Sequence, residues 1–275
     1  MKATKQIFSI EASDQRIRQI LESDDGGYAD SDAIPNFESL TYDNGFYVDC
    51  AAVFIDIRGS TSLPKKHSSP VLGKIYRAYI SECIAVLNQD THCGEIFIQG
   101  DCVGAVFHIP VPEAVDSVFR RAAELNSVIE HLNWRLSQQR YTKLVCGIGM
   151  AVGRALMIKA GYKGSGINDI VWMGNVVNEA AKLCHLGNRD GRGVVQVSAA
   201  AFGKLSKENQ ALLSETRAGF GRLIHHQGTF VSNEMAGWTK QLSGARDSDL
   251  TKLGKWMGIV DEPQAGGLRK VPNGE

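Results

Sequence analysis

The sequence predicts an α+β fold whose core elements follow the order β-α-β-β-α-β. Residues 46–57 form an apolar, β-branched run that is typical of a buried strand. Apolar residues recur at helical spacing over 71–88 and 112–136, which indicates two core-facing helices. Paired β-type runs surround turn residues at 94–107 and again at 143–159, which predicts two hairpins. This order is the ferredoxin-like arrangement, which hosts many different functions.

Both ends of the chain extend beyond this core. We interpret residues 1–45 as an N-terminal extension that contains one amphipathic helix, near 14–23, followed by a loop rich in Asp and Gly at 24–36. The domain itself is expected to span residues 46–242. The remaining 243–275 are polar and glycine-rich, so we expect a C-terminal tail that is partly disordered.

The second half of the chain contains further short elements. Asn175 is expected to cap a helix that ends near Leu186. Within the tail, 250–256 has a helical pattern, and 264–275 is expected to be disordered. The other predicted elements are a strand at 167–174, a strand at 194–197, helical runs at 198–205 and 206–213, and a last strand at 222–230.

The composition excludes several classes of protein. Thirty Lys and Arg residues balance thirty Asp and Glu residues, so general attraction to nucleic acid or to an anionic membrane is not expected. No apolar run approaches the roughly 20 residues of a membrane-spanning helix, and the start lacks the apolar core of a secretory signal. The six cysteines form no CxxC pair, which favours reduced thiols and a cytoplasmic location.

Two carboxylates are predicted to lie at neighbouring strand ends. Asp56 ends the first strand, and alone it would be read as a turn former or cap. The chain then turns at Gly59, and Ser60 and Thr61 are good helix N-cap residues whose free N–H groups attract phosphate. Asp101 lies at the turn of the adjacent hairpin. Two carboxylates that share a site repel each other unless a cation lies between them, and Mg²⁺ commonly uses one or two protein carboxylates.

Five segments together resemble the class III adenylate and guanylate cyclases. VFIDIRGSTSL and QGDCVGAVF resemble their two metal-binding segments, and CGIGMAVGRALMIKAG resembles the strand pair that follows. WMGNVVNEAAKL is similar to the helix that contributes catalytic residues, and VVQVSAAAFGKL to the strand and helix after it. The resemblance covers about residues 47–205, with the segments in the family's order.

The resemblance implies a metal and phosphate site in each chain. Asp56 and Asp101 would each bridge two divalent cations, Mn²⁺ or Mg²⁺, with the backbone carbonyl of Ile57 as a further ligand. Arg154, which is predicted to follow a turn at Gly153, would bind the triphosphate with a cationic fork. The other residues expected to bind substrate are Phe54, Gly59, Ser60 and Thr61.

The family works as a dimer, which implies a homodimer with composite active sites. Asn178 would then contact the ribose bound to the other subunit. Lys182 stands where most members have a transition-state Arg, so it keeps the charge and loses the bidentate fork. The expected reaction is attack of the ribose 3′-hydroxyl on the α-phosphorus, with pyrophosphate as the leaving group.

Two departures from the family pattern concern the base. Adenylate cyclases read adenine with a Lys, and guanylate cyclases read guanine with a Glu, at the position that Phe97 occupies. The second base-reading position holds Val171. Neither purine hydrogen-bond pair can form with these apolar residues, although both residues could equally be ordinary packing positions.

The altered positions leave several interpretations open. A compact chain with one cyclase domain resembles the pyrimidine cyclases of bacterial antiphage defence, which make cyclic UMP or cyclic CMP to activate a separate effector protein. This favours UTP as substrate, with CTP next. The alternatives are an adenylate cyclase that makes cyclic AMP, an inactive nucleotide-binding pseudo-cyclase, and a non-enzymatic sensor or dimerisation module.

Overall fold

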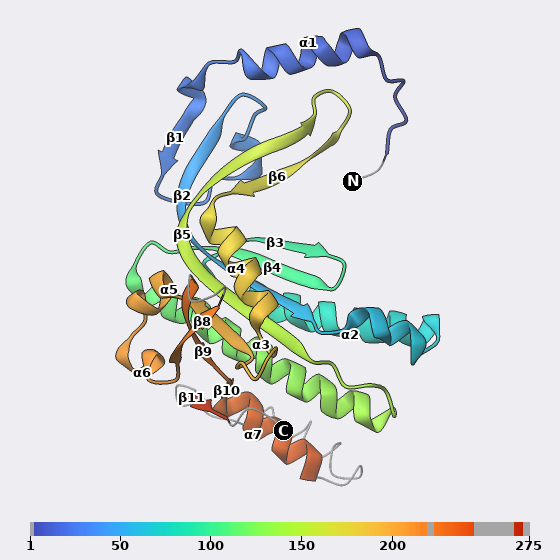
Figure 1. Cartoon of the computed structure of the whole chain (residues 1–275), viewed down its shortest axis with the longest axis vertical. Helices are drawn as coiled ribbons and strands as arrows, with labels where there is room; N and C mark the ends of the chain where they lie inside the picture. The colour runs from blue at the N-terminus through green and yellow to red at the C-terminus, as the bar shows by residue number, and fades with distance from the viewer. Residues whose placement is uncertain (1–2, 219–222, 245–266, 272–275) are drawn as a thin grey trace, which may run out of the picture.

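The computed structural model describes residues 3–218, 223–244 and 267–271. A central sheet runs in the order β3-β4-β2-β5-β7-β9-β8, with β1 paired to β2 and β6 paired to β5 (Figure 1). The first strands of this chain are β1 (Tyr28–Ser31), β2 (Gly45–Ile57), β3 (Cys93–Gln99), β4 (Cys102–His108), β5 (Cys146–Tyr162) and β6 (Ile167–Met173). The later strands are β7 (Val195–Ser198), β8 (Ser214–Ala218), β9 (Leu223–Gly228), β10 (Phe230–Ser232) and β11 (Leu268–Lys270).

Helices cover both faces of the sheet. The α-helices are α1 (Ile10–Leu21), α2 (Ser69–Asn88), α3 (Pro112–Gln138), α4 (Asn175–Leu186), α5 (Ala199–Lys204), α6 (Lys207–Gln210) and α7 (Asn233–Gly244). The short 3-10 helices are η1 (Asp25–Gly27), η2 (Phe37–Ser39) and η3 (Ser60–Lys65). Among the described residues, no helix is long and apolar enough to cross a membrane.

The middle of β2 is buried on both sides, which explains its unbroken apolar sequence. Val53 and Ile55 belong to the larger core, together with residues of α2 and α3. Ala52 and Phe54 project from the opposite face into a smaller core with α4. In Figure 1, α4 crosses in front of β5, on the face of the sheet that α2 and α3 do not cover.

The predicted α+β fold is confirmed. The strands β2, β3, β4 and β5, with α2 and α3 between them, follow the expected β-α-β-β-α-β order. Their order in the sheet, β3-β4-β2-β5, is the one that the ferredoxin-like arrangement requires. The β3–β4 hairpin has its turn at Gly100 and Asp101, where it was expected.

The second predicted hairpin is wrong. Residues 146–162 form a single strand, β5, which pairs with β2 in unbroken register from Ile57–Cys146 to Gly45–Ile158. Gly153, expected at a turn, lies opposite Cys50 inside this ladder, where a Cβ would meet Val176 of α4 at 3.4 Å. Gly153 is therefore an extended strand residue that packs against α4, rather than a turn residue. The true hairpin joins β5 to β6.

Three smaller expectations also need correction. The expected loop at 24–36 contains β1, which pairs in parallel with the start of β2. Gly174, with a φ of 147°, precedes α4, and Asn175 is its first helical residue rather than its cap. Within the predicted disordered end, β11 pairs with β10. The helical pattern at 250–256 lies outside the described residues.

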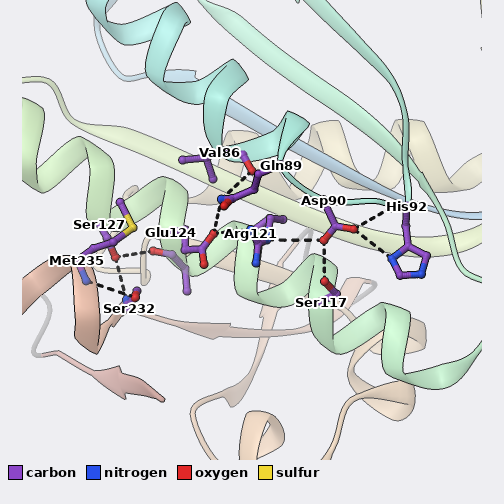
Figure 2. Close-up of polar contacts among 11 residues, drawn as sticks. Val86, Gln89, Asp90, His92, Ser117, Arg121, Glu124, Ser127, Ser232 and Met235 are labelled. Atoms are coloured by element: carbon purple, nitrogen blue, oxygen red, sulfur yellow. Dashed lines mark hydrogen bonds and ion pairs between the residues drawn. The ribbon is translucent and has the colours of Figure 1, made fainter. Parts of the chain in front are cut away.

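A buried polar network fastens α2 and α3 to the start of β3 (Figure 2). The side chain of Asp90, 2% exposed, accepts hydrogen bonds from Ser117 Oγ at 2.6 Å and from the His92 backbone at 3.0 Å. Arg121 lies 3.6 Å from the same carboxylate and 2.9 Å from Glu124. This network holds the helical layer in place behind the strands that carry the carboxylates.

Candidate active site

Two carboxylates meet where β2 ends and β4 begins. β2 pairs with β4 as far as Ile55 and Val103, so Asp56 lies one residue beyond this pair, beside the turn that holds Asp101. Burial raises the pKa of Asp56, the negative charge of Asp101 raises it further, and the Arg58 guanidinium partly opposes both effects. The two carboxyl groups therefore lie close enough to repel each other.

A cation with oxygen ligands fits this pair. Asp101 Oδ2 is buried and has no hydrogen-bond partner among the described residues, which is costly unless a cation binds it. Ile57, whose carbonyl is a predicted ligand, is the last residue of β2. The described part of the chain holds no cluster of three or more His, Cys, Asp or Glu that could bind a metal. Mg²⁺ needs no such cluster, because water and phosphate fill its other positions.

Backbone donors follow the first carboxylate. Gly59 has a φ of 64° and precedes the 3-10 helix η3, a conformation that glycine adopts without strain. The sequence predicts Ser60 and Thr61 as helix caps; the cap residue is instead Gly59, which makes no side-chain cap hydrogen bond. The N–H groups of Ser60 and Thr61 are in the first turn of the helix, where donors lack helical partners and can bind phosphate.

Phe54 and Phe97 form an apolar wall beside the carboxylates. Phe54, Gly104 and Phe97 are direct neighbours across β2, β4 and β3. The ring centroids of the two Phe residues are 5.2 Å apart. A Cβ at Gly104 would overlap the Phe97 ring and lie 2.9 Å from Phe54 Cε1, so glycine leaves the space that the rings fill. Because side chains alternate along a strand, Phe54 and Asp56 project from the same face.

The structure does not bring Arg154 to the carboxylates of its own chain. On β5, Gly147 lies opposite Asp56 and Arg154 lies opposite Asp49. Seven residues of strand separate the two positions, about 23 Å at about 3.3 Å per residue. Arg154 instead forms an exposed ion pair with Asp30 of β1 and lies 4.6 Å above the Tyr47 ring.

Val171 lies at the far end of β5 from the carboxylates. It pairs with Ile158, at the opposite end of β5 from Gly147, and the residue is 38% exposed. Its neighbour Trp172 is held differently, because the indole Nε1 donates to Glu95 at 2.6 Å. Glu95 is two residues from Phe97 on β3, so this hydrogen bond joins the strand of Val171 to the strand of Phe97.

α4 presents Asn178 and Lys182 away from the sheet. The two residues are one helical turn apart on one face, and both are exposed. The sheet-facing side chains of the helix, among them Val176, Ala180 and Leu183, are buried. Asn178 and Lys182 thus lie on a surface that another subunit can reach.

Three side chains reach the carboxylate end without having been predicted from the sequence. Arg58 forms an ion pair with Asp56, with 3.2 Å between Nη1 and Oδ2. The positive charge of Arg189 also lowers the pKa of Asp56. Burial and the charge of Asp101 raise the pKa of Tyr76, and a hydrogen bond with Ser60 opposes them. Only Arg58 had a sequence signal, because it is two residues from Asp56.

Known proteins are similar to this chain in sequence. A protein of Gulbenkiania mobilis named uridylate cyclase is 44% identical over 199 residues, which cover 69% of this chain and 76% of the relative. A uridylate cyclase of Treponema porcinum is 32% identical over 210 residues, covering 76% and 73%.

Solved structures agree on the fold. The adenylyl cyclase CyaB from P. aeruginosa matches with a TM-score of 0.56 and 18% identity, over 67% of this chain and 95% of that one. A class III adenylyl cyclase-like ATP-binding protein from Pseudomonas aeruginosa matches with a TM-score of 0.60 and 22% identity, over 75% and 46%. Residues 44–219 match the family described as "Adenylate and Guanylate cyclase catalytic domain". The chain belongs to that family.

Proposed function

We propose that this chain is a uridylate cyclase, which converts UTP to 3′,5′-cyclic UMP and pyrophosphate, with CTP as the next-best substrate. The observation that carries the proposal is the Phe54–Phe97 pair, whose ring centroids are 5.2 Å apart, on the same face as the Asp56 carboxylate. The names of the two relatives above support it. Phe97 offers no hydrogen bond to a purine edge, and its ring fills space that a larger base would need.

Each subunit would supply the metal half of a site. Two divalent cations, Mn²⁺ or Mg²⁺, held by Asp56, Asp101 and the Ile57 carbonyl, would lower the pKa of the ribose 3′-hydroxyl and neutralise phosphate charge. The N–H groups around Gly59, Ser60 and Thr61 would donate to the triphosphate. The phenyl rings would pack against the base and exclude water from that side of it.

The other half of each site would come from a second copy of the chain. Asn178 of the partner subunit would hydrogen-bond the ribose, and Lys182 of the partner subunit would stabilise charge on the phosphoryl oxygens. The 3′-oxygen then attacks the α-phosphorus in line, the bond to pyrophosphate breaks, and the hydroxyl proton leaves to solvent. Catalysis of this kind depends on positioning and electrostatics rather than on a protein nucleophile.

The cellular part of the proposal follows from the product. A soluble cyclic pyrimidine nucleotide made in the cytoplasm can act as a second messenger that activates a separate effector protein. We propose this role in bacterial antiphage defence, with no direct contact to nucleic acid or membrane.

A four-nucleotide assay tests the proposed activity. Purified protein is incubated separately with UTP, CTP, ATP and GTP in the presence of Mn²⁺ or Mg²⁺, and cyclic nucleotide and pyrophosphate are quantified. We expect cyclic UMP to dominate. Cyclic AMP as the main product would overturn the pyrimidine assignment, and absence of product from all four substrates would overturn the enzyme.

A further inference from the structure

The guanidinium of Arg58 is buried between the end of β2 and the end of α4. Its Nε donates to the Gly187 carbonyl at 3.0 Å, and Nη2 donates to the Cys184 carbonyl. On its other side, Nη1 lies 3.2 Å from Asp56 Oδ2. The side chain is only 9% exposed. One planar group therefore contacts both a predicted metal ligand and the carboxyl end of a helix.

β5 leaves a passage for this group at Gly147. The residue lies directly opposite Asp56 in the β2–β5 ladder. A Cβ there would overlap Arg58 Nη2 and lie 2.6 Å from the Cys184 carbonyl. No residue larger than glycine leaves room for the guanidinium to reach α4 without a shift of the backbone. The position of the Arg58 side chain thus depends on a glycine at residue 147.

The contacts with α4 place a cation at the end of the helix, where the Cys184 carbonyl also accepts from the backbone N–H of Gly187 at 3.1 Å. The last carbonyl groups of a helix lack partners within it, and a cation there interacts favourably with the helix dipole. A lysine could supply that charge alone. The planar fork of arginine donates to the two carbonyls and the carboxylate from three different nitrogens in fixed directions, whereas the three donors of a lysine radiate from one nitrogen on a flexible stem. This rigid geometry points to a role beyond capping.

We propose that Arg58 is a positioning residue that fixes Asp56 and the carboxyl end of α4 in one frame. This inference rests on the proposed function, in which Asp56 serves the site of its own chain while Asn178 and Lys182 of α4 serve the partner's site. The same guanidinium therefore sets the metal half of one active site and the ribose and phosphate half of the other.

Direct metal binding tests whether Arg58 positions Asp56. Binding of Mn²⁺ alone is followed by electron paramagnetic resonance of the free ion, which requires no turnover. Arg58→Met should bind Mn²⁺ about tenfold more weakly, the size of effect usual for a residue that orients a ligand. Arg58→Lys should be only partly restored. Arg217→Met, an exposed arginine on β8, is the matched control and should bind as wild type.

Mixed dimers separate the effect of Arg58 on Asp56 from its effect on α4. One chain carries Asp56→Ala, the other carries Asn178→Ala, and two different affinity tags isolate the mixed dimer, which retains one complete site. Arg58→Met added to the Asn178→Ala chain should raise the Mn²⁺ requirement about tenfold, because that chain supplies Asp56. The same change on the Asp56→Ala chain should lower kcat about tenfold at an unchanged Mn²⁺ requirement, because that chain supplies α4.

Each outcome decides the inference. Unchanged Mn²⁺ binding in Arg58→Met overturns it, as does an identical loss in both mixed dimers accompanied by an equal fall in Tm, which marks a purely structural role. Inactivity of the mixed dimer with both Arg58 residues intact would count against the proposed composite site instead. In that case the Mn²⁺ measurement on Arg58→Met still decides whether Arg58 positions Asp56.

Discussion

The two ends of the long β2–β5 ladder differ in what they bring together. At the Ile57–Cys146 end, Asp56 meets the β3–β4 turn and the end of α4, and its carboxylate, the Arg58 guanidinium and the buried oxygen of Asp101 converge. At the Gly45–Ile158 end, Arg154 contacts Asp30 of the N-terminal extension and the Tyr47 ring, and Val171 is exposed.

This difference indicates how a site can be divided between chains. The carboxylate end holds one half of the predicted site in a single subunit. The residues that the family pattern adds to it, Arg154, Val171, Asn178 and Lys182, all lie on exposed positions. These four exposed residues can contribute to a site only where a second copy of the chain packs against them. Homodimerisation would therefore be a condition for chemistry and not an accessory to it.

The largest effect is expected at the carboxylate end. Asp101→Asn keeps the shape of the side chain and removes its charge, so we expect cyclic UMP formation to fall about a thousandfold, which corresponds to about 4 kcal/mol of lost charge stabilisation. Asp25→Asn, on the exposed η1 helix, is the control. Substantial activity in Asp101→Asn would show that this carboxylate pair is not the reaction centre.

A smaller effect is expected at the apolar wall. Phe97→Ala removes the ring that packs on Phe54 and opens the space above Gly104. The KM for UTP should rise about tenfold, because stacking of a base on an aromatic side chain is worth about 1–3 kcal/mol.

The selectivity of the same variant is the sharper measurement. The ratio of kcat/KM for UTP to that for ATP should fall in Phe97→Ala, because a purine gains room. Phe37→Ala, an exposed phenylalanine on η2, should change neither value. An unchanged ratio in Phe97→Ala would assign this residue to the core alone.

An effect on substrate binding of similar size is expected for Arg154, at the Gly45–Ile158 end of the β2–β5 ladder. Arg154→Gln should raise the KM for UTP about tenfold, since a hydrogen bond to a charged group is worth about 1.5–3 kcal/mol. The Tm should stay unchanged, because the ion pair with Asp30 is exposed on both sides and such pairs contribute little. Asp30→Asn removes the competitor for the guanidinium and should not raise KM. Equal KM values for wild type and Arg154→Gln would exclude this end from substrate binding.

The smallest effect on activity is expected from the buried network around Asp90, which joins α2 and α3 to the start of β3. Burial alone would raise the pKa of Asp90, but hydrogen bonds from Ser117 and His92 and the charge of Arg121 lower it overall (Figure 2). A carboxyl group with a lowered pKa in the folded state stabilises the fold above its unfolded pKa, about 3.9. That contribution is lost as the pH falls through the folded pKa.

Denaturant unfolding at several pH values measures this contribution. At pH 7, Asp90→Asn should unfold with a free energy about 1–3 kcal/mol lower than wild type, since buried hydrogen bonds to a charged group are lost. The difference should narrow as the pH falls below the unfolded pKa of about 3.9 and the wild-type carboxylate becomes protonated. A difference that does not depend on pH would mean that the charge of Asp90 contributes nothing to stability.

Much of the fold could be predicted from local patterns. The apolar run of β2, the helical stripes of α2 and α3, and the turn at Gly100 and Asp101 each have a signature within a short window, and each lies where it was expected. The long β5 was misread because Gly153 is a turn former in isolation. Its extended conformation is imposed by pairing with Cys50 and by the nearby α4.

The predicted site divides in the same way. Adjacency of Asp56 and Asp101 follows from topology, because a strand and the neighbouring hairpin turn can meet only at one edge. The separation of Arg154 from them depends on strand register, which no local pattern encodes. Arg189 and Tyr76 were missed because they come from elements distant in the sequence.

The sequence by itself determined the order of the elements, the two carboxylates and the family resemblance, because periodicity, turn chemistry and motif spacing are local properties. Only the tertiary structure decided that Phe54, Gly104 and Phe97 share one row, that Gly147 admits the Arg58 guanidinium, and that Asn178 and Lys182 face outward. These are relations across strands and between helix and sheet, and they arise from side-chain packing that a one-dimensional pattern does not contain.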